Sequence, residues 1–159
     1  KGKENNVDYI KSNFTEIENG VNKVKSDLKD FLNSTTIKKS LLVVDDSNII
    51  INYIENLVKS DYNVVRANNG IEAVNKLDEN IYALLLDINM PKSTGIDVLK
   101  YMNDNDLIEK IPVVIITGND TSNQIKELIG YNVLDVLNKP FTPDNIKRVL
   151  TLIENFHNN

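Results

Sequence analysis

The hydrophobic positions of residues 7–31 recur at alternating intervals of three and four. The eight residues of this stripe are Val7, Ile10, Phe14, Ile17, Val21, Val24, Leu28 and Phe31. This spacing is typical of the a and d positions of a coiled coil, and it predicts an amphipathic helix about 36 Å long at ~1.5 Å per residue. The polar residues 33–36, Asn-Ser-Thr-Thr, end the pattern as a short connector.

A helix with such a stripe buries it against another helix, and three arrangements remain open. The first is a homodimer in which residues 7–31 of two chains pair as a coiled coil. The second is a helix that folds back on its own chain. The third is a helical hairpin broken near Gly20, because glycine inside a helix costs about 1 kcal/mol. The e and g positions carry no regular alternation of opposite charges, so they do not select a partner.

After residue 40 the pattern changes to short apolar runs that alternate with segments of helical period. The runs at 41–46, 62–67, 82–87, 111–117 and 133–137 are predicted strands, and the segments at 47–60, 70–79, 94–103, 122–130 and 142–156 are predicted helices. Strands that are apolar on both faces, each followed by a helix, indicate a parallel sheet with helices on both faces. The sequence therefore predicts an α/β domain at 37–159, preceded by a helix and linker at 1–36.

Composition and charge exclude several classes of function. The 159 residues contain no cysteine, which excludes disulfides and thiolate metal sites. The longest apolar run, 81–86, is too short to span a bilayer, so this piece is expected to make no membrane contact. Residues 41–159 carry 17 acidic against 10 basic side chains, which argues against nucleic-acid binding by this piece.

The two ends of the sequence add an expectation about its cellular context. No secretion signal opens the chain, which favours a cytoplasmic location. The first residue is Lys1 and not Met, which suggests a piece of a longer polypeptide. His157, the single histidine, lies near the other end, and we interpret it as a tail residue that is neither a ligand nor a phosphate carrier.

Polar residues stand where four of the predicted strands end. The first strand ends in Asp45 and Asp46, the third in Asp87, the fourth in Thr117, and the fifth in Lys139, followed by Pro140. The carboxyl ends of parallel strands meet at one edge of a sheet, where ligands bind. Three carboxylates at one edge repel each other unless a cation neutralises them, and hard oxygen ligands suit Mg²⁺. A hydroxyl and an ammonium complete a phosphate site.

Each of these residues also has a simpler explanation when it is taken alone. Asp46 is a good helix N-cap, and Asp87 is a good first residue of a turn. Thr117 is compatible with a loop, and Lys139 with a solvated charge. The functional interpretation rests on their joint occurrence at the ends of strands one, three, four and five.

In these segments the sequence resembles the receiver domain of two-component response regulators. The resemblance covers residues 40–157 and rests on LLVVDDS, NNGIEAV, LLLDINMPKSTGIDVL, PVVIITG and VLDVLNKPF. It implies a flavodoxin-like sheet of strand order 2-1-3-4-5. It also implies that Asp87 accepts a phosphoryl group from a phosphohistidine on a histidine kinase or histidine phosphotransfer protein.

The resemblance further implies a role for each residue of the site. Asp46 would bind Mg²⁺ directly, Asp45 directly or through water, and Asp87 and the Asn89 backbone carbonyl would complete the protein ligands. Lys139 would pair with the phosphoryl oxygens, and Thr117 would bond one of them. The bond between Lys139 and Pro140 would be cis.

Three positions depart from the family pattern. Val136 stands where family members usually carry Tyr or Phe, and Asn132 and Val133 replace a Gly-Ala pair. We therefore expect the conformational switch that starts at Thr117 to run differently, while the phosphoryl chemistry is retained.

The expected function is a phosphorylation-controlled switch that hydrolyses its own acyl phosphate and is not otherwise an enzyme. One alternative is a Mg²⁺-dependent phosphohydrolase with an aspartyl nucleophile, but the amide of Asn89 stands where such enzymes place a second Asp, and it cannot shuttle the proton. Another is an inactive receiver-like scaffold, which the complete set of five site residues argues against. A receiver behind a long helix suggests the carboxyl-terminal receiver of a hybrid histidine kinase, or a regulator whose helix joins it to an upstream module.

Overall fold

The computed structural model describes residues 16–28, 38–90, 93–118, 126–128 and 130–159. The chain divides into two compact units, Lys1–Ile37 and Lys38–Asn159. Residues 16–28 of the first unit form a helix whose four stripe residues, Ile17, Val21, Val24 and Leu28, are 47–65% exposed. The other four stripe residues, Val7, Ile10, Phe14 and Phe31, lie outside the described residues. What covers the stripe therefore stays a prediction.

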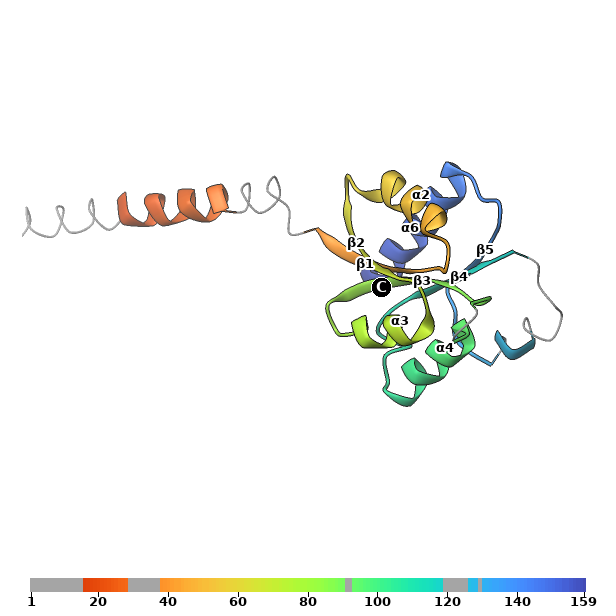
Figure 1. Ribbon diagram of the computed structural model, residues 1–159. Helices are drawn as coiled ribbons and strands as arrows, with labels where there is room; N and C mark the ends of the chain where they lie inside the picture. Colours follow the sequence, from red (N-terminus) through yellow and green to blue (C-terminus); the bar gives the residue numbers. More distant parts are fainter. Residues whose placement is uncertain (1–15, 29–37, 91–92, 119–125, 129) are drawn as a thin grey trace, which may run out of the picture. The chain divides into compact units, whose positions relative to one another are not determined.

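The second unit contains a five-stranded parallel sheet between two layers of helices (Figure 1). Its strands are β1 (Lys39–Val44), β2 (Tyr62–Ala67), β3 (Ile81–Asp87), β4 (Val113–Thr117) and β5 (Asp135–Asn138). They are ordered β2-β1-β3-β4-β5, and every neighbouring pair is parallel. The predicted α/β fold class and strand order are confirmed. Strands β1, β3 and β4, which end at or directly before Asp45, Asp87 and Thr117, lie side by side at the centre of the sheet.

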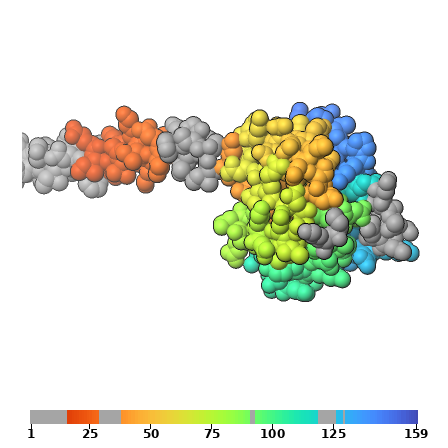
Figure 2. All heavy atoms as spheres, in the orientation of Figure 1, coloured from red at the N-terminus to blue at the C-terminus, as the bar shows by residue number. Residues whose placement is uncertain are grey.

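The helices cover both faces of the sheet. They are α2 (Asn48–Val58), α3 (Gly70–Lys76), α4 (Gly95–Asp104) and α6 (Pro143–Asn158). In Figure 1, α2 and α6 lie above the sheet and α3 and α4 below it, and in Figure 2 the side chains of α2 and α4 form the upper and lower surfaces of this face. Of the predicted helix at 122–130, residues 126–128 are helical and the others, apart from residue 130, lie outside the described residues. Within the described part of the chain, no helix is long and apolar enough to cross a membrane.

Alternate residues of the strands belong to two separate hydrophobic cores. On β1, Leu41 and Val43 pack in the core beneath α2 and α6, whereas Leu42 and Val44 pack in the core beneath α3 and α4. All four are fully buried. Because side chains of a strand point alternately to the two faces, a strand covered on both faces must be apolar throughout. This explains why the strand sequences read as unbroken apolar runs.

Several predicted element boundaries are wrong by one to three residues; the first strand, for example, was predicted at 41–46 and is Lys39–Val44. The fifth strand begins at Asp135 and not at Val133, because the Val133 N–H donates to the Tyr131 carbonyl at 3.0 Å in a turn. The helix predicted at 70–79 ends at Lys76, because Leu77 takes an extended backbone conformation and buries its side chain.

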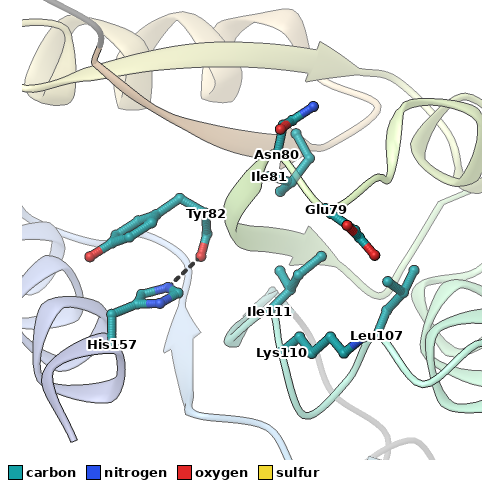
Figure 3. A pocket seen from close by; sticks show the side chains of 8 residues that line it. All are labelled: Glu79, Asn80, Ile81, Tyr82, Leu107, Lys110, Ile111 and His157. Atoms are coloured by element: carbon teal, nitrogen blue, oxygen red, sulfur yellow. Dashed lines mark hydrogen bonds between the residues drawn. The ribbon is translucent and has the colours of Figure 1, made fainter.

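The amino-terminal edge of the sheet holds a contact that corrects the interpretation of His157. Its ring stacks on that of Tyr82 with centroids 3.8 Å apart, and its Nε2 lies 2.8 Å from the Tyr82 carbonyl oxygen (Figure 3). His157 therefore belongs to the last turn of α6 and, although exposed, is held against Tyr82; that it is neither a ligand nor a phosphate carrier stays a prediction. It and Tyr82 line a pocket of about 320 Å³ together with Ile81 and Ile111.

Beside this stack, Glu154 of α6 joins three elements. Its carboxylate accepts hydrogen bonds from the hydroxyls of Tyr62 at 2.5 Å and Tyr82 at 2.9 Å, and Lys39 Nζ lies 3.4 Å from Glu154 Oε2. Burial alone would raise the pKa of Glu154, but these three donors lower it below its usual value. The start of β1 is thereby fastened to α6 at the edge opposite the predicted site.

Candidate functional site

The ends of the central strands bring the predicted site residues together. Asp87 is the last residue of β3, Thr117 is the last residue of β4, and Asp45 directly follows β1. The Asp45 N–H continues the ladder by donating to the Ala67 carbonyl at 3.1 Å. Asp45, Asp87 and Thr117 are at most 2% exposed and are the three buried polar or charged residues among those described. Burying polar groups in this way is costly unless they are paired or bind a ligand.

Three carboxylates form a cluster at this edge of the sheet. One oxygen from each of Asp45, Asp46 and Asp87 lies within 4.8 Å of the others, and Asp46 is the exposed member of the three. Carboxylate oxygens are hard donors of the kind that Mg²⁺ takes. The residues present therefore fit the predicted ion.

Lys139 reaches this cluster from the end of β5. Its Nζ lies 2.8 Å from Asp45 Oδ2 and 3.4 Å from Asp87 Oδ2, and its backbone N–H donates to the Thr117 carbonyl at 2.7 Å. Burial alone would lower the pKa of the Lys139 ammonium, but the two carboxylates raise it above its usual value. The following bond to Pro140 is cis, which confirms that prediction.

Asp87 both begins a turn and faces the ammonium of Lys139, so the two explanations for its position in the sequence hold together. Its Oδ1 accepts the Asn89 N–H at 2.9 Å, so the carboxylate does begin a turn, while its Oδ2 faces Lys139. Burial is the main cause that raises the pKa of Asp87 above its usual value. The Asn89 N–H opposes that rise, the charge of Asp45 adds to it, and Lys139 opposes it. Burial therefore outweighs the donors that would favour the charged form of Asp87.

The hydroxyl of Thr117 is buried at the end of β4. Its side chain is 1% exposed, and its Oγ1 has no hydrogen-bond partner among the described residues. A buried hydroxyl without a partner costs about 1–3 kcal/mol, so such groups are uncommon in folded proteins. An oxygen of a ligand bound at Asp87 would give this hydroxyl an acceptor.

Gly95 supports the site in a way that the sequence analysis missed. A Cβ atom at this position would lie 2.7 Å from the Asp87 carbonyl oxygen and 2.8 Å from Ile88 Cα. Only glycine therefore lets the first turn of α4 approach the backbone that carries Asp87. The capping box formed by Thr94 and Asp97 fixes the same turn. The Thr-Gly pair at the start of the predicted helix was the available sequence signal.

An apolar hollow adjoins the site beside Lys139. It has a volume of about 350 Å³ and is lined by Ile49, Ile50, Tyr53, Lys139, Pro140 and Phe141. Ile49 is 79% exposed on α2, which is high for an aliphatic side chain. The charged site is thus bordered by an apolar surface.

The three departures from the family pattern lie away from the carboxylates. Val136 is paired with Ile115 in the β4–β5 register, and its side chain is 38% exposed. Asn132 is exposed and Val133 is half-buried in the connection that leads into β5.

Comparison with known proteins agrees with this geometry. The family model of the response regulator receiver domain matches residues 41–151. The chemotaxis protein CheY1 of Helicobacter pylori is 34% identical over 117 residues, which are 71% of this chain and 94% of CheY1. Histidine kinase P4 of Formosa agariphila is 28% identical over 120 residues, which are 74% of this chain and 9% of the kinase. The structure of the REC domain of AraT, a response regulator from Geobacillus stearothermophilus, matches with a TM-score of 0.66 at 27% identity, covering 77% of this chain and 98% of that domain.

Proposed function

The chain belongs to the receiver domain family of two-component response regulators, and from this premise we propose that Asp87 is its phosphoacceptor. The observation that carries the proposal is that Lys139 Nζ lies 3.4 Å from the buried Asp87 at the end of β3, while the neighbouring strand β4 ends in Thr117, whose buried hydroxyl has no partner among the described residues. An ammonium and a hydroxyl placed around a nucleophilic carboxylate suit phosphoryl transfer, which depends on positioning and on neutralised phosphoryl oxygens.

The transfer step follows from these positions. An Asp87 carboxylate oxygen forms a bond to phosphorus as the bond between phosphorus and the partner's histidine nitrogen breaks, and the histidine leaves with the electron pair. Lys139 then shifts its pairing toward the phosphoryl oxygens, and the Thr117 hydroxyl donates to one of them. Phosphorylation adds between about −1.5 and −2 charges to a side chain. The rearranged contacts of Lys139 and Thr117 would transmit this change to the surface.

Asp45, Asp46 and Asp87 would hold Mg²⁺ together with the Asn89 backbone carbonyl. The ion would supply neutralisation of the phosphoryl oxygens. The protein's own contribution is to keep three carboxylates within 4.8 Å of one another, at the cost of their mutual repulsion. Receiver-type chemistry at this site is confined to the chain itself: acceptance of a phosphoryl group and later hydrolysis of the acyl phosphate.

Two alternatives are less well supported. A phosphohydrolase acting on external esters needs a general acid and base beside the nucleophile, and the residue two positions after Asp87 is Asn89. A scaffold with lapsed chemistry has no use for a buried hydroxyl without a partner at Thr117 or for a carboxylate cluster at Asp87.

The proposed partner is a protein that presents a phosphohistidine, either a histidine kinase or a histidine phosphotransfer protein. The apolar hollow at Ile49, Tyr53 and Pro140 offers such a partner a contact surface at the edge of the site.

We also propose that residues 7–31 pair two chains as a coiled coil. We further propose that this chain is the receiver part of a hybrid histidine kinase, because it is similar to a segment of histidine kinase P4.

Incubation with acetyl phosphate and Mg²⁺, followed by intact mass spectrometry, tests the proposed chemistry. The protein should gain about 80 Da, the mass of one phosphoryl group, and should gain nothing when Mg²⁺ is chelated before acetyl phosphate is added. A protein that gains no mass under these conditions would be the inactive scaffold.

A further inference from the structure

The amide of Asn68 spans the loop that carries Asp46. Asn68 directly follows β2, and its Nδ2 donates to the Asp45 carbonyl oxygen at 3.2 Å and to Asn48 Oδ1 at 2.8 Å. These two acceptors lie on either side of Asp46 and Ser47. A side-chain amide has two N–H donors, and each is directed to one end of the loop.

The loop has little else to fix Asp46. The Asp46 carboxylate makes no hydrogen bond or ion pair with a described residue, and it is exposed. Ser47, the N-cap of α2, makes no capping bond with its side chain. The Ser47 N–H donates instead to Asp45 Oδ1 at 2.8 Å, so this bond holds the buried aspartate and not the exposed one.

Asn68 is itself held firmly at the start of α3. Its backbone N–H donates to Glu72 Oε2 at 2.7 Å, and the Glu72 N–H donates to the side chain of Asn69, the N-cap of α3, at 2.9 Å. This reciprocal arrangement connects the first turn of α3 to the loop after β1. Asn68 therefore links the first turn of α3 to a loop whose exposed Asp46 carboxylate has no bond to a described residue.

We infer that Asn68 is a positioning residue for the Mg²⁺ site. It sets the conformation of residues 45–48 and thereby the place of the Asp46 carboxylate beside Asp45 and Asp87. The inference rests on the proposed function, in which those three carboxylates hold the ion. Residues that orient metal ligands without touching the metal typically contribute about 10- to 100-fold in affinity. Because Asn68 acts here on the backbone and on a neighbouring side chain, the expected contribution is smaller.

The test compares Asn68→Ala with Asn63→Ala. Asn63 is a matched control, because it lies on β2, the strand that Asn68 follows, and its Nδ2 also donates to a backbone carbonyl, that of Lys38, at 3.4 Å, but at the opposite edge of the sheet. Mg²⁺ affinity is measured by NMR titration of the backbone amides, without any phosphodonor. Asn68→Ala should weaken Mg²⁺ binding by about threefold to tenfold, and Asn63→Ala should leave it within about twofold of the parent.

The outcomes separate this inference from the proposed function. A parent protein that binds no Mg²⁺ would overturn the proposed metal site and the inference with it. A parent that binds Mg²⁺ and an Asn68→Ala variant of equal affinity, even with a lower melting temperature, would overturn the inference alone. Asn48→Ala gives a second measure if Asn68→Ala does not fold. It should weaken binding in the same direction, because it removes one of the two bonds that Asn68 makes, and unchanged affinity there would also count against the inference.

Discussion

Lys139 Nζ lies 2.8 Å from Asp45 Oδ2 but 3.4 Å from Asp87 Oδ2, so the ammonium pairs more closely with a proposed metal ligand than with the proposed phosphoacceptor. Both carboxylates are buried, and the lysine side chain is 25% exposed. In the absence of metal, Lys139 therefore supplies the positive charge that the carboxylates need. Binding of Mg²⁺ would compete with this pairing and leave the ammonium available to a phosphoryl group.

Lys139→Met should have opposite effects on stability and on metal binding. Without metal, it should lower the free energy of unfolding by roughly 2–3 kcal/mol, because two buried carboxylates lose their cation. It should also tighten Mg²⁺ binding, because no ammonium competes for Asp45. Urea unfolding and Mg²⁺ titration measure the two effects, with Lys100→Met on the exposed surface of α4 as the control. Weaker Mg²⁺ binding in Lys139→Met would show that the ammonium does not compete with the ion.

Asp46→Asn should separate the metal site from the fold. Mg²⁺ should raise the melting temperature of the parent through mass action, because the folded state assembles the three carboxylates and the unfolded state does not. Asp46→Asn should lose most of this rise, while its melting temperature without metal stays close to that of the parent, because Asp46 is exposed. Asp61→Asn removes an exposed carboxylate elsewhere and should respond to Mg²⁺ as the parent does. An equal rise in Asp46→Asn would place the ion elsewhere.

Glu154→Gln should make the protein less stable at neutral pH but not in acid. The pKa of Glu154 is lowered in the folded state by the Tyr62 and Tyr82 hydroxyls and by Lys39, although burial opposes this. A carboxylate with a lowered pKa stabilises the fold above its usual value of 4.5, and that contribution is lost as the pH falls through the folded-state pKa.

We expect Glu154→Gln to cost on the order of 1 kcal/mol at neutral pH, a value reduced for solvent screening because the side chain is about a third exposed. The difference from the parent should shrink as unfolding is repeated at increasingly acid pH. Glu109→Gln, at an exposed position, is the control. A difference that is independent of pH would mean that the contacts of Glu154 do not depend on its charge.

The stripe at 7–31 should make the whole chain a dimer. Sedimentation should show a dimer for the parent and a monomer after deletion of residues 1–36. Ile17→Asp combined with Val24→Asp should also give a monomer, because both side chains lie on the stripe and are exposed in the described helix. Asn19→Asp combined with Asn22→Asp adds the same charge off the stripe and should remain dimeric. A monomeric parent would contradict the self-pairing and favour a helix that folds back on its own chain.

The fold and the residues of the candidate site could be predicted because short stretches of the sequence indicate them. An apolar run such as 81–86 indicates a strand covered on both faces, and the polar residue that ends it, Asp87, must then lie at the edge of the sheet. Thr117 was found in the same way. Element ends were less reliable, because turns such as that between Tyr131 and Val133 depend on hydrogen bonds that the apolar pattern does not contain.

The supporting residues could not be predicted because their partners are distant in the chain. Asn68 bonds a loop about twenty residues away, and His157 packs on Tyr82 from the other end of the domain. Asparagine is common throughout this sequence, so one asparagine after β2 carried no signal. The close approach of the Gly95 backbone to the Asp87 carbonyl depends on how α4 packs against the sheet, and no spacing in the sequence specifies that packing.

The most direct test of the account is the mass of Asp87→Asn after incubation with acetyl phosphate and Mg²⁺. The variant should fold, because burial raises the pKa of Asp87 and the folded state therefore favours an uncharged group at this position. The parent and the control Asp61→Asn should each gain about 80 Da, and Asp87→Asn should gain nothing. A folded Asp87→Asn protein that still gains this mass would contradict the assignment of Asp87 as the phosphoacceptor.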